Sequence, residues 1–150
     1  MAASDTEYNL GCLMSEINNS CNTHAGKIYE TLQDNGALTE KKILKKTGLT
    51  ENEFYCGIGW LARENKVRQE KDTFTLDETN LTPQIGKNAG KIWLALDIWG
   101  EVDFLSVNRL AQIKDTDLLS AIGWLSREDK IDGAWPPNKD EDTKFWLKQQ

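Results

Sequence analysis

Ala25-Gly26-Lys27-Ile28 recurs as Ala89-Gly90-Lys91-Ile92, and Ile58-Gly59-Trp60-Leu61 recurs as Ile122-Gly123-Trp124-Leu125. Both recurrences are 64 residues apart, and residues 25–66 match residues 89–130 at 13 of 42 positions without a gap. This agreement indicates a tandem duplication. Two units of about 60 residues are too few for a solenoid, so the sequence predicts two small globular domains.

Helix signals occur in the same order in each repeat. A first helix ends before Gly36, and Thr39 can cap a second helix that ends at Gly48. A third helix begins at the capping box Thr50-Glu51-Asn52-Glu53. The same signals follow in repeat 2, where Asp103 is the cap of the second helix.

After the third helix the apolar spacing changes from the period of a helix to that of a strand. Residues 66–76 read as a short hairpin, and residues 130–131 and 144–147 read as its counterpart around a longer loop. Helix, short strand, helix, turn, helix and hairpin is the order of a winged helix-turn-helix domain. The predicted fold class is therefore α+β and mostly helical, with two tandem winged helix-turn-helix domains.

The predicted domains are residues 22–76 and residues 87–150, joined by a polar linker at residues 77–86. Residues 1–21 lie outside the repeat and read as an amphipathic helical extension, because a capping box at Ser4 precedes apolar residues with helical spacing. Those apolar residues are Leu10, Leu13, Met14 and Ile17. Three alternatives remain for this helix: it docks on repeat 1, it forms a dimer contact, or it is disordered.

Composition excludes several classes of protein. The chain has 150 residues, with 18 Lys and Arg against 24 Asp and Glu, so its formal net charge is −6. It has no run of about 18 apolar residues and no secretory signal, and we expect a cytoplasmic protein without membrane contact. Cys12, Cys21 and Cys56 are odd in number and lack a Cys-x-x-Cys spacing, which predicts reduced thiols rather than a disulfide or a zinc site. With a single histidine, His24, and no phosphate-binding glycine loop, we expect no catalysis, no metal and no cofactor.

The repeated motifs also resemble a known family. Ala-Gly-Lys-Ile near the start of a helix, followed by Gly57-Ile-Gly-Trp-Leu-Ala-Arg-Glu-Asn-Lys-Val67, is similar to a family of small uncharacterised winged helix-turn-helix proteins of archaea and bacteria. The resemblance covers residues 25–76 and, with a longer wing, residues 89–147. It implies the fold and a link to DNA or transcription, and it supplies no catalytic residues.

Candidate nucleic-acid contacts concentrate in repeat 1. In a helix-turn-helix the third helix enters the major groove, while the second helix and the wing contact phosphates. The candidates are Lys41, Lys42, Lys45 and Lys46 on the second helix, Asn52 and Arg63 on the third helix, and Arg68 and Lys71 on the wing. Repeat 2 has lost most of these cations, and its wing at residues 136–142 is acidic.

Candidate protein contacts lie in repeat 2. Most of the six tryptophans are expected in the core, with Trp99 at a helix end and Trp135 beside two prolines as the exceptions. Gly123 and its counterpart Gly59 lie inside helices, where glycine costs about 1 kcal/mol relative to alanine. Two explanations remain for these glycines: packing within each domain, or a shallow strip that accepts a partner helix or the neighbouring repeat.

Two functions therefore remain open. The first is a DNA-binding or transcription-associated regulator that contacts duplex DNA mainly through domain 1. The second is a protein-interaction adaptor that has lost nucleic-acid binding, with a protein partner or self-association through domain 2 and the N-terminal helix. Winged helices serve both purposes, so the fold does not choose between them.

Overall fold

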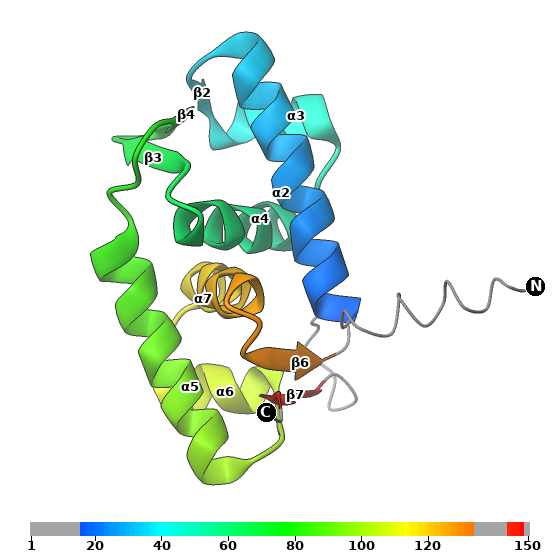
Figure 1. Cartoon of the computed structure of the whole chain (residues 1–150), viewed down its shortest axis with the longest axis vertical. Coiled ribbons are helices and arrows are strands. Elements are labelled where there is room, and N and C mark those ends of the chain that lie inside the picture. The colour runs from blue at the N-terminus through cyan, green and yellow to red at the C-terminus, as the bar shows by residue number, and fades with distance from the viewer. Residues whose placement is uncertain (1–15, 134–143, 149–150) are drawn as a thin grey trace, which may run out of the picture.

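The computed structural model describes residues 16–133 and 144–148 and shows the two predicted winged helix-turn-helix repeats (Figure 1). Repeat 1 contains α2 (Glu16–Asn35), β2 (Leu38–Thr39), α3 (Glu40–Thr47), α4 (Glu51–Arg63), β3 (Val67–Glu70) and β4 (Thr73–Leu76). Repeat 2 contains α5 (Lys87–Trp99), β5 (Val102–Asp103), α6 (Phe104–Ala111), α7 (Asp115–Arg127), β6 (Ile131–Gly133) and β7 (Lys144–Leu147). From the end of the first helix to the start of the first wing strand, the boundaries of repeat 2 lie 64 residues after those of repeat 1. The predicted fold class is confirmed.

The predicted caps set the helix ends of repeat 1. The Thr39 side chain accepts a hydrogen bond from the Lys42 backbone N–H and begins α3, and Gly48 ends it in the left-handed conformation at φ +77°. At the start of α4, the Thr50 side chain accepts from the Glu53 N–H at 3.2 Å, and the Glu53 carboxylate accepts from the Thr50 N–H at 2.9 Å. The capping box read from the sequence is therefore present.

Each wing closes into a three-stranded antiparallel sheet. The strand orders are β2-β4-β3 in repeat 1 and β5-β7-β6 in repeat 2. Phe74 pairs with Leu38 in the first sheet, and Phe145 pairs with Val102 in the second. Both phenylalanines are buried, so each wing is attached to the core of its repeat through the same position.

The two repeats share one core. A short π-helical turn, η1 (Thr82–Gly86), leads directly into α5, and Ile85 within it and Leu81 just before it are buried. The buried apolar residues of both repeats form a single continuous cluster. In Figure 1, α4 and α7 lie side by side at the centre of this arrangement. No helix in the described part of the chain is long and apolar enough to span a membrane.

The start of α2 contacts repeat 2. Ile17 is fully buried, and the Asn18 amide donates to the backbone oxygen of Ser126 at 3.0 Å and to the carboxylate of Asp129 at 3.2 Å. We expected the N-terminal helix to dock on repeat 1, to form a dimer contact or to be disordered. Its described part, residues 16–21, docks on repeat 1, where Cys21 meets Cys56 of α4, and it contacts repeat 2 as well. The rest of the predicted extension, residues 1–15, lies outside the described residues.

Candidate nucleic-acid interface

The third helices of the two repeats pack against each other through small residues. A Cβ atom added to Gly59 of α4 would overlap the backbone oxygen of Ser120 in α7. One added to Gly123 of α7 would overlap the backbone oxygen of Cys56 in α4. The two backbones therefore touch at a pair of equivalent positions. Of the two explanations for these glycines, the strip that accepts the neighbouring repeat is confirmed.

Reciprocal ion pairs join the C-terminal ends of these two helices. Arg63 Nε of α4 donates to a Glu128 carboxylate oxygen at 2.9 Å, and Arg127 Nε of α7 donates to Glu64 at 2.8 Å. The guanidinium of Arg63 also lies 5.7 Å from the ring centroid of Trp124, at cation–π distance. The arrangement has approximate twofold symmetry within one chain, because each contact occurs twice with the repeats exchanged.

This packing covers the face of α4 that would enter a major groove. Cys56 and Gly59 are buried against α7, and the Arg63 side chain is engaged with Glu128. Asn52 lies apart from them, exposed in the first turn of α4 beside the acidic Glu51. The structure therefore does not bring Asn52 and Arg63 together on one open surface, because α7 covers the middle of α4 between them.

The lysines of α3 form the most exposed cationic surface of repeat 1. Lys41, Lys42, Lys45 and Lys46, hereafter the lysine face, occupy one side of the helix and are all exposed. The opposite side carries the buried Ile43. None of the four lysines forms an ion pair with another residue of 16–133 or 144–148, so their ammonium groups are available to an outside anion.

A tyrosine holds the lysine helix against α4. The Tyr55 hydroxyl donates to the Glu40 carboxylate at 2.6 Å. Burial raises the pKa of Tyr55 well above its usual range, and the hydrogen bond to Glu40 adds to the effect. The hydroxyl therefore stays protonated and keeps donating, which fixes the start of α3 relative to α4.

The wing of repeat 1 adds less cationic charge than its sequence indicates. Arg68 in β3 is half-buried, and its Nε lies 2.5 Å from the Glu70 carboxylate, so its charge is largely balanced. Lys71 is exposed in the hairpin turn between β3 and β4, with φ +58°. Of the two predicted wing residues, Lys71 has the freer charge.

The predicted protein-contact residues have different surroundings. Trp99 is exposed at the end of α5, and Gly123 lies in the contact between the repeats. Trp135 lies outside the described residues. The remaining tryptophans are Trp60, which is buried, Trp124, which is half-buried, and Trp93 and Trp146, which are exposed. The expectation that most tryptophans are in the core is therefore wrong for the described residues, because α5 and β7 place theirs on the surface.

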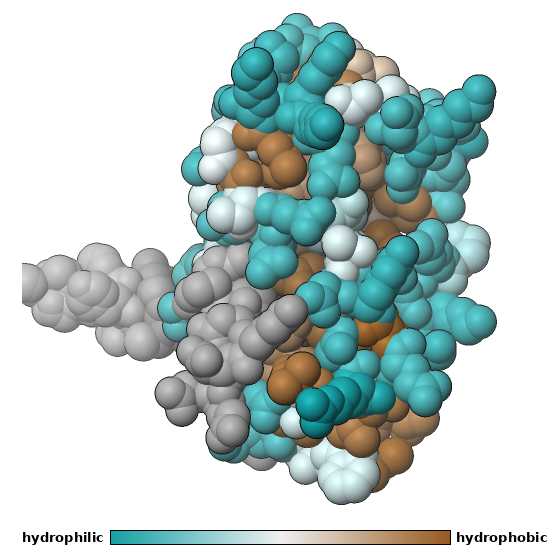
Figure 2. Space-filling view, turned by 180° about the vertical axis from the view of Figure 1, so that it is seen from behind, coloured by the Kyte–Doolittle hydropathy of each residue, from teal (hydrophilic) through white to brown (hydrophobic). Residues whose placement is uncertain are grey.

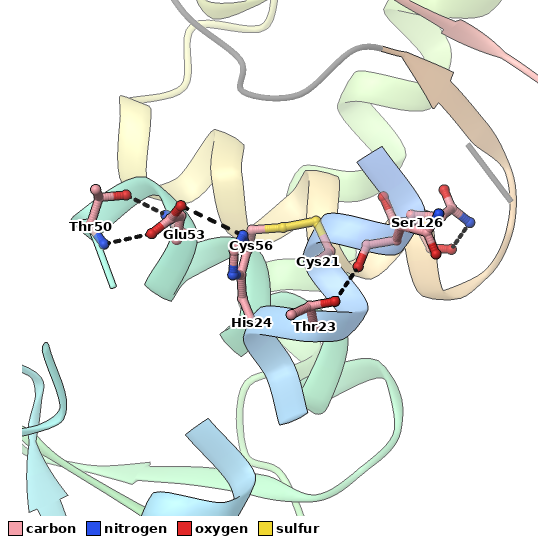
Figure 3. Close-up of a disulfide and its surroundings, with 9 residues drawn as sticks. Cys21, Thr23, His24, Thr50, Glu53, Cys56 and Ser126 are labelled. Carbon is pink, nitrogen blue, oxygen red and sulfur yellow. Dashed lines mark hydrogen bonds and ion pairs between the residues drawn. A yellow bond between two sulfur atoms is a disulfide. The ribbon is translucent and has the colours of Figure 1, made fainter. Parts of the chain in front are cut away.

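The prediction of reduced thiols is also wrong for two cysteines. Cys21 of α2 and Cys56 of α4 form a disulfide, with their Cα atoms 5.3 Å apart (Figure 3). The two residues are 35 positions apart, and only the packing of α2 on α4 brings them together, so local spacing gives no sign of the pair. The bond ties the first helix of repeat 1 to the helix that contacts repeat 2.

The histidine of the chain lies beside this disulfide. His24 is buried, and its Nε2 is 3.8 Å from the Glu53 carboxylate (Figure 3). Burial lowers the pKa of His24 below 6.5, Glu53 opposes this shift, and Lys27 adds to it. Among the residues that the structure describes, no three His, Cys, Asp or Glu side chains gather in a way that could hold a metal ion.

Comparison with known proteins agrees with the duplicated fold. Residues 17–76 and 77–143 each match the family described as "Winged helix-turn-helix domain (DUF2582)". An uncharacterised protein of Methanocaldococcus jannaschii is 44% identical over 50 residues, which cover 32% of this chain and 71% of that protein. That relative is therefore about the length of one repeat. No solved structure shows a significant match. The chain belongs to this winged helix-turn-helix family and carries its domain twice.

Proposed function

We propose that this is a non-catalytic protein that binds the phosphate backbone of duplex DNA through the lysine face, without reading base sequence. The observation that carries this proposal is the placement of lysines along the whole length of α3. Lys45 and Lys46 lie in the last turn, where cations interact favourably with the helix dipole. Lys41 and Lys42 lie in the first turn, where the dipole disfavours them.

The lysine face also repels itself. Lys41 and Lys45 are one helical turn apart, as are Lys42 and Lys46, and each such like-charge pair destabilises a helix by about 0.2–0.5 kcal/mol. Helix stability therefore does not explain why four lysines occupy these positions. A polyanionic partner explains them, because it would neutralise all four charges at once.

The closed contact between α4 and α7 supports backbone binding rather than base reading. Phosphate contacts need only exposed cations, whereas base contacts need a helix or strand inside a groove. With Gly59 and Gly123 in contact with the opposite backbone, the middle of each third helix is closed to a groove. We therefore expect similar affinity for duplexes of unrelated sequence.

The test is a fluorescence anisotropy titration of the full chain with labelled duplex DNA of about 20 base pairs. If four lysines neutralise four phosphates, the logarithm of the binding constant falls with the logarithm of salt concentration at a slope of about −4. Substituting Lys42→Glu and Lys45→Glu together is expected to abolish binding at about 50 mM salt. The control pair Lys87→Glu and Lys114→Glu makes the same change of charge on exposed positions of repeat 2 and is expected to retain most of the affinity.

Three results would contradict the proposal. They are absence of binding at about 50 mM salt, equal loss in the two charge-reversal pairs, and a preference of about 100-fold or more for one duplex sequence. Absence of binding would favour the second hypothesis, a protein-interaction adaptor. One observation favours that second candidate: the groove-reading faces of both repeats are already used for contact within the protein.

A further inference from the structure

Repeat 2 exposes large apolar side chains over the end of α5 and along α6. Their exposed fractions are 53% for Leu94, 65% for Ile98, 60% for Trp99, 36% for Leu105 and 45% for Leu110. These five residues are called the apolar face below. In Figure 2, brown side chains gather at the lower end of the molecule, where repeat 2 lies, while the upper end is mostly teal. Scattered exposed leucines are ordinary, whereas an exposed apolar group on this scale is often functional.

Repeat 1 shows that the fold does not need these residues. The duplication supplies a counterpart for each position of the apolar face, 64 residues earlier. The counterparts of Leu94, Ile98, Trp99, Leu105 and Leu110 are Glu30, Asp34, Asn35, Lys41 and Lys46. All five counterparts are charged or polar, and all are exposed on the same helices. The apolar character of this face is therefore specific to repeat 2 and has a cause outside the folding of the domain.

The apolar face is hollowed between its two helices. A groove of about 340 Å³ lies between α5 and α6, lined on its apolar walls by Leu94, Ile98, Trp99 and Leu110. A second hollow between Trp99 and Leu110 reaches Arg109. Both are shallow and open along the surface, a shape that suits side chains of another protein surface better than an enclosed small molecule.

The size and charge of the face favour a second copy of this chain as its partner. The five side chains expose roughly 500 Å² of apolar surface, and a standard interface buries about 800 Å² per partner once its polar rim is included. The exposed charges beside the face are mixed in sign, with Lys91, Arg109 and Lys144 against Asp97 and Glu101, and Lys144 is paired with Glu101. A rim of mixed sign selects neither an acidic nor a basic partner. An identical face can place its charges of one sign against those of the other, and homodimer interfaces are the more apolar class.

We propose that two copies of this chain associate through the apolar face, packing α5 and α6 of one copy against α5 and α6 of the other. Such an interface is isologous, so Ile98 and Trp99 contribute twice. It is separate from the α4–α7 contact and from the lysine face, and it stands whether or not the protein binds DNA.

The test is sedimentation velocity of the full chain from about 1 to 100 μM. We expect the mass to rise with concentration from 17.0 kDa toward twice that value. Because the contact is mainly apolar, we expect association to persist at about 1 M salt. The variant Ile98→Asp with Trp99→Asn, which installs the residues found at the same positions of repeat 1, is expected to remain monomeric throughout.

Two further variants make the test independent of folding defects. Leu110→Lys changes the face from α6 and is also expected to be monomeric, with unchanged helical circular dichroism. Gln33→Asp adds one negative charge to an exposed position of α2 and is expected to associate like the unaltered protein. A monomeric unaltered protein at about 100 μM would overturn the proposal, including the case in which residues 1–15 of the same chain cover the face. Association that survives in both face variants would overturn it as well.

Discussion

Alanine at position 59 tests the contact between the repeats most directly. A Cβ atom there would overlap the Ser120 backbone oxygen and lie 2.7 Å from the carbonyl carbon and 3.0 Å from Cα of the same residue. These atoms belong to the backbone of α7 and cannot rotate aside as a side chain would. The two helices must therefore separate along their contact, at a cost of about 3 kcal/mol, the upper part of the usual range for overpacking.

Helix propensity acts in the opposite direction and allows a matched control. Replacing glycine by alanine inside a helix stabilises it by about 1 kcal/mol when the new methyl group meets nothing. Gly26 of α2 is such a position, since no atom lies within 4 Å of a Cβ added there. We therefore expect Gly26→Ala to stabilise the protein by about 1 kcal/mol. Gly59→Ala is expected to destabilise it by about 2 kcal/mol, a gap of about 3 kcal/mol between the two variants.

Urea denaturation followed by circular dichroism measures both variants on the same scale. For a chain of this size, a loss of about 2 kcal/mol corresponds to a fall in Tm of roughly 4–8 °C. Gly123→Ala is expected to match Gly59→Ala, because its Cβ would overlap the Cys56 backbone oxygen. If Gly59→Ala proved as stable as Gly26→Ala, the helices would not be in backbone contact and the reasoning would be refuted.

Three further predictions concern the surroundings of this contact. The exposed pair Arg63–Glu128 is expected to give a coupling of only about 0.5–1 kcal/mol in a double-mutant cycle with alanine, and a value near zero would show that the pair is not formed in solution. Because burial lowers the pKa of His24, the unfolded chain binds a proton at this residue more readily than the folded protein does. The contribution of neutral His24 to the free energy of unfolding is therefore present above pH 6.5 and decreases as the pH falls below that value. His24→Gln is expected to lessen this loss between about pH 7 and 5.5, and an identical pH profile would contradict the assignment. With Cys21 and Cys56 bonded, thiol titration of the denatured, unreduced chain is expected to detect one free thiol among the three cysteines. Reduction of the bond is expected to lower the free energy of unfolding by about 3–4 kcal/mol. Detection of three free thiols would rule the bond out.

The sequence predicts the parts of the fold that depend on local chemistry. The caps at Thr39 and Thr50 and the left-handed end at Gly48 are fixed by interactions within a few residues, and each is where the sequence places it. Because of the duplication, the same helix boundaries are predicted for repeat 2. Contacts between distant segments are different, since the Cys21–Cys56 bond depends on how α2 crosses α4 and has no local signature.

The candidate surfaces were only partly predictable. The α3 lysines are exposed, as amphipathic spacing implies, but the sequence does not show that Arg63 is paired across the repeats with Glu128. A signal was present, because Arg63-Glu64 recurs as Arg127-Glu128, and two copies of such a pair can bridge each other in reciprocal fashion. Leu94 and Ile98 were missed as surface candidates, because helical spacing alone does not separate a buried apolar residue from an exposed one. Comparison with Glu30 and Asp34 at the matching positions of repeat 1 separates them.

The fusion of the two repeats has a consequence for how the surfaces can differ. When a pair of domains is built from two identical chains, every substitution appears on both halves, so the pair has two equal ends. Here the pair is held within one chain by reciprocal contacts such as Gly59 on Ser120 and Gly123 on Cys56. Each half can therefore change without altering the other. One end of the molecule presents cations and the opposite end presents apolar side chains, which gives the protein a polarity that a symmetric dimer of single repeats would lack.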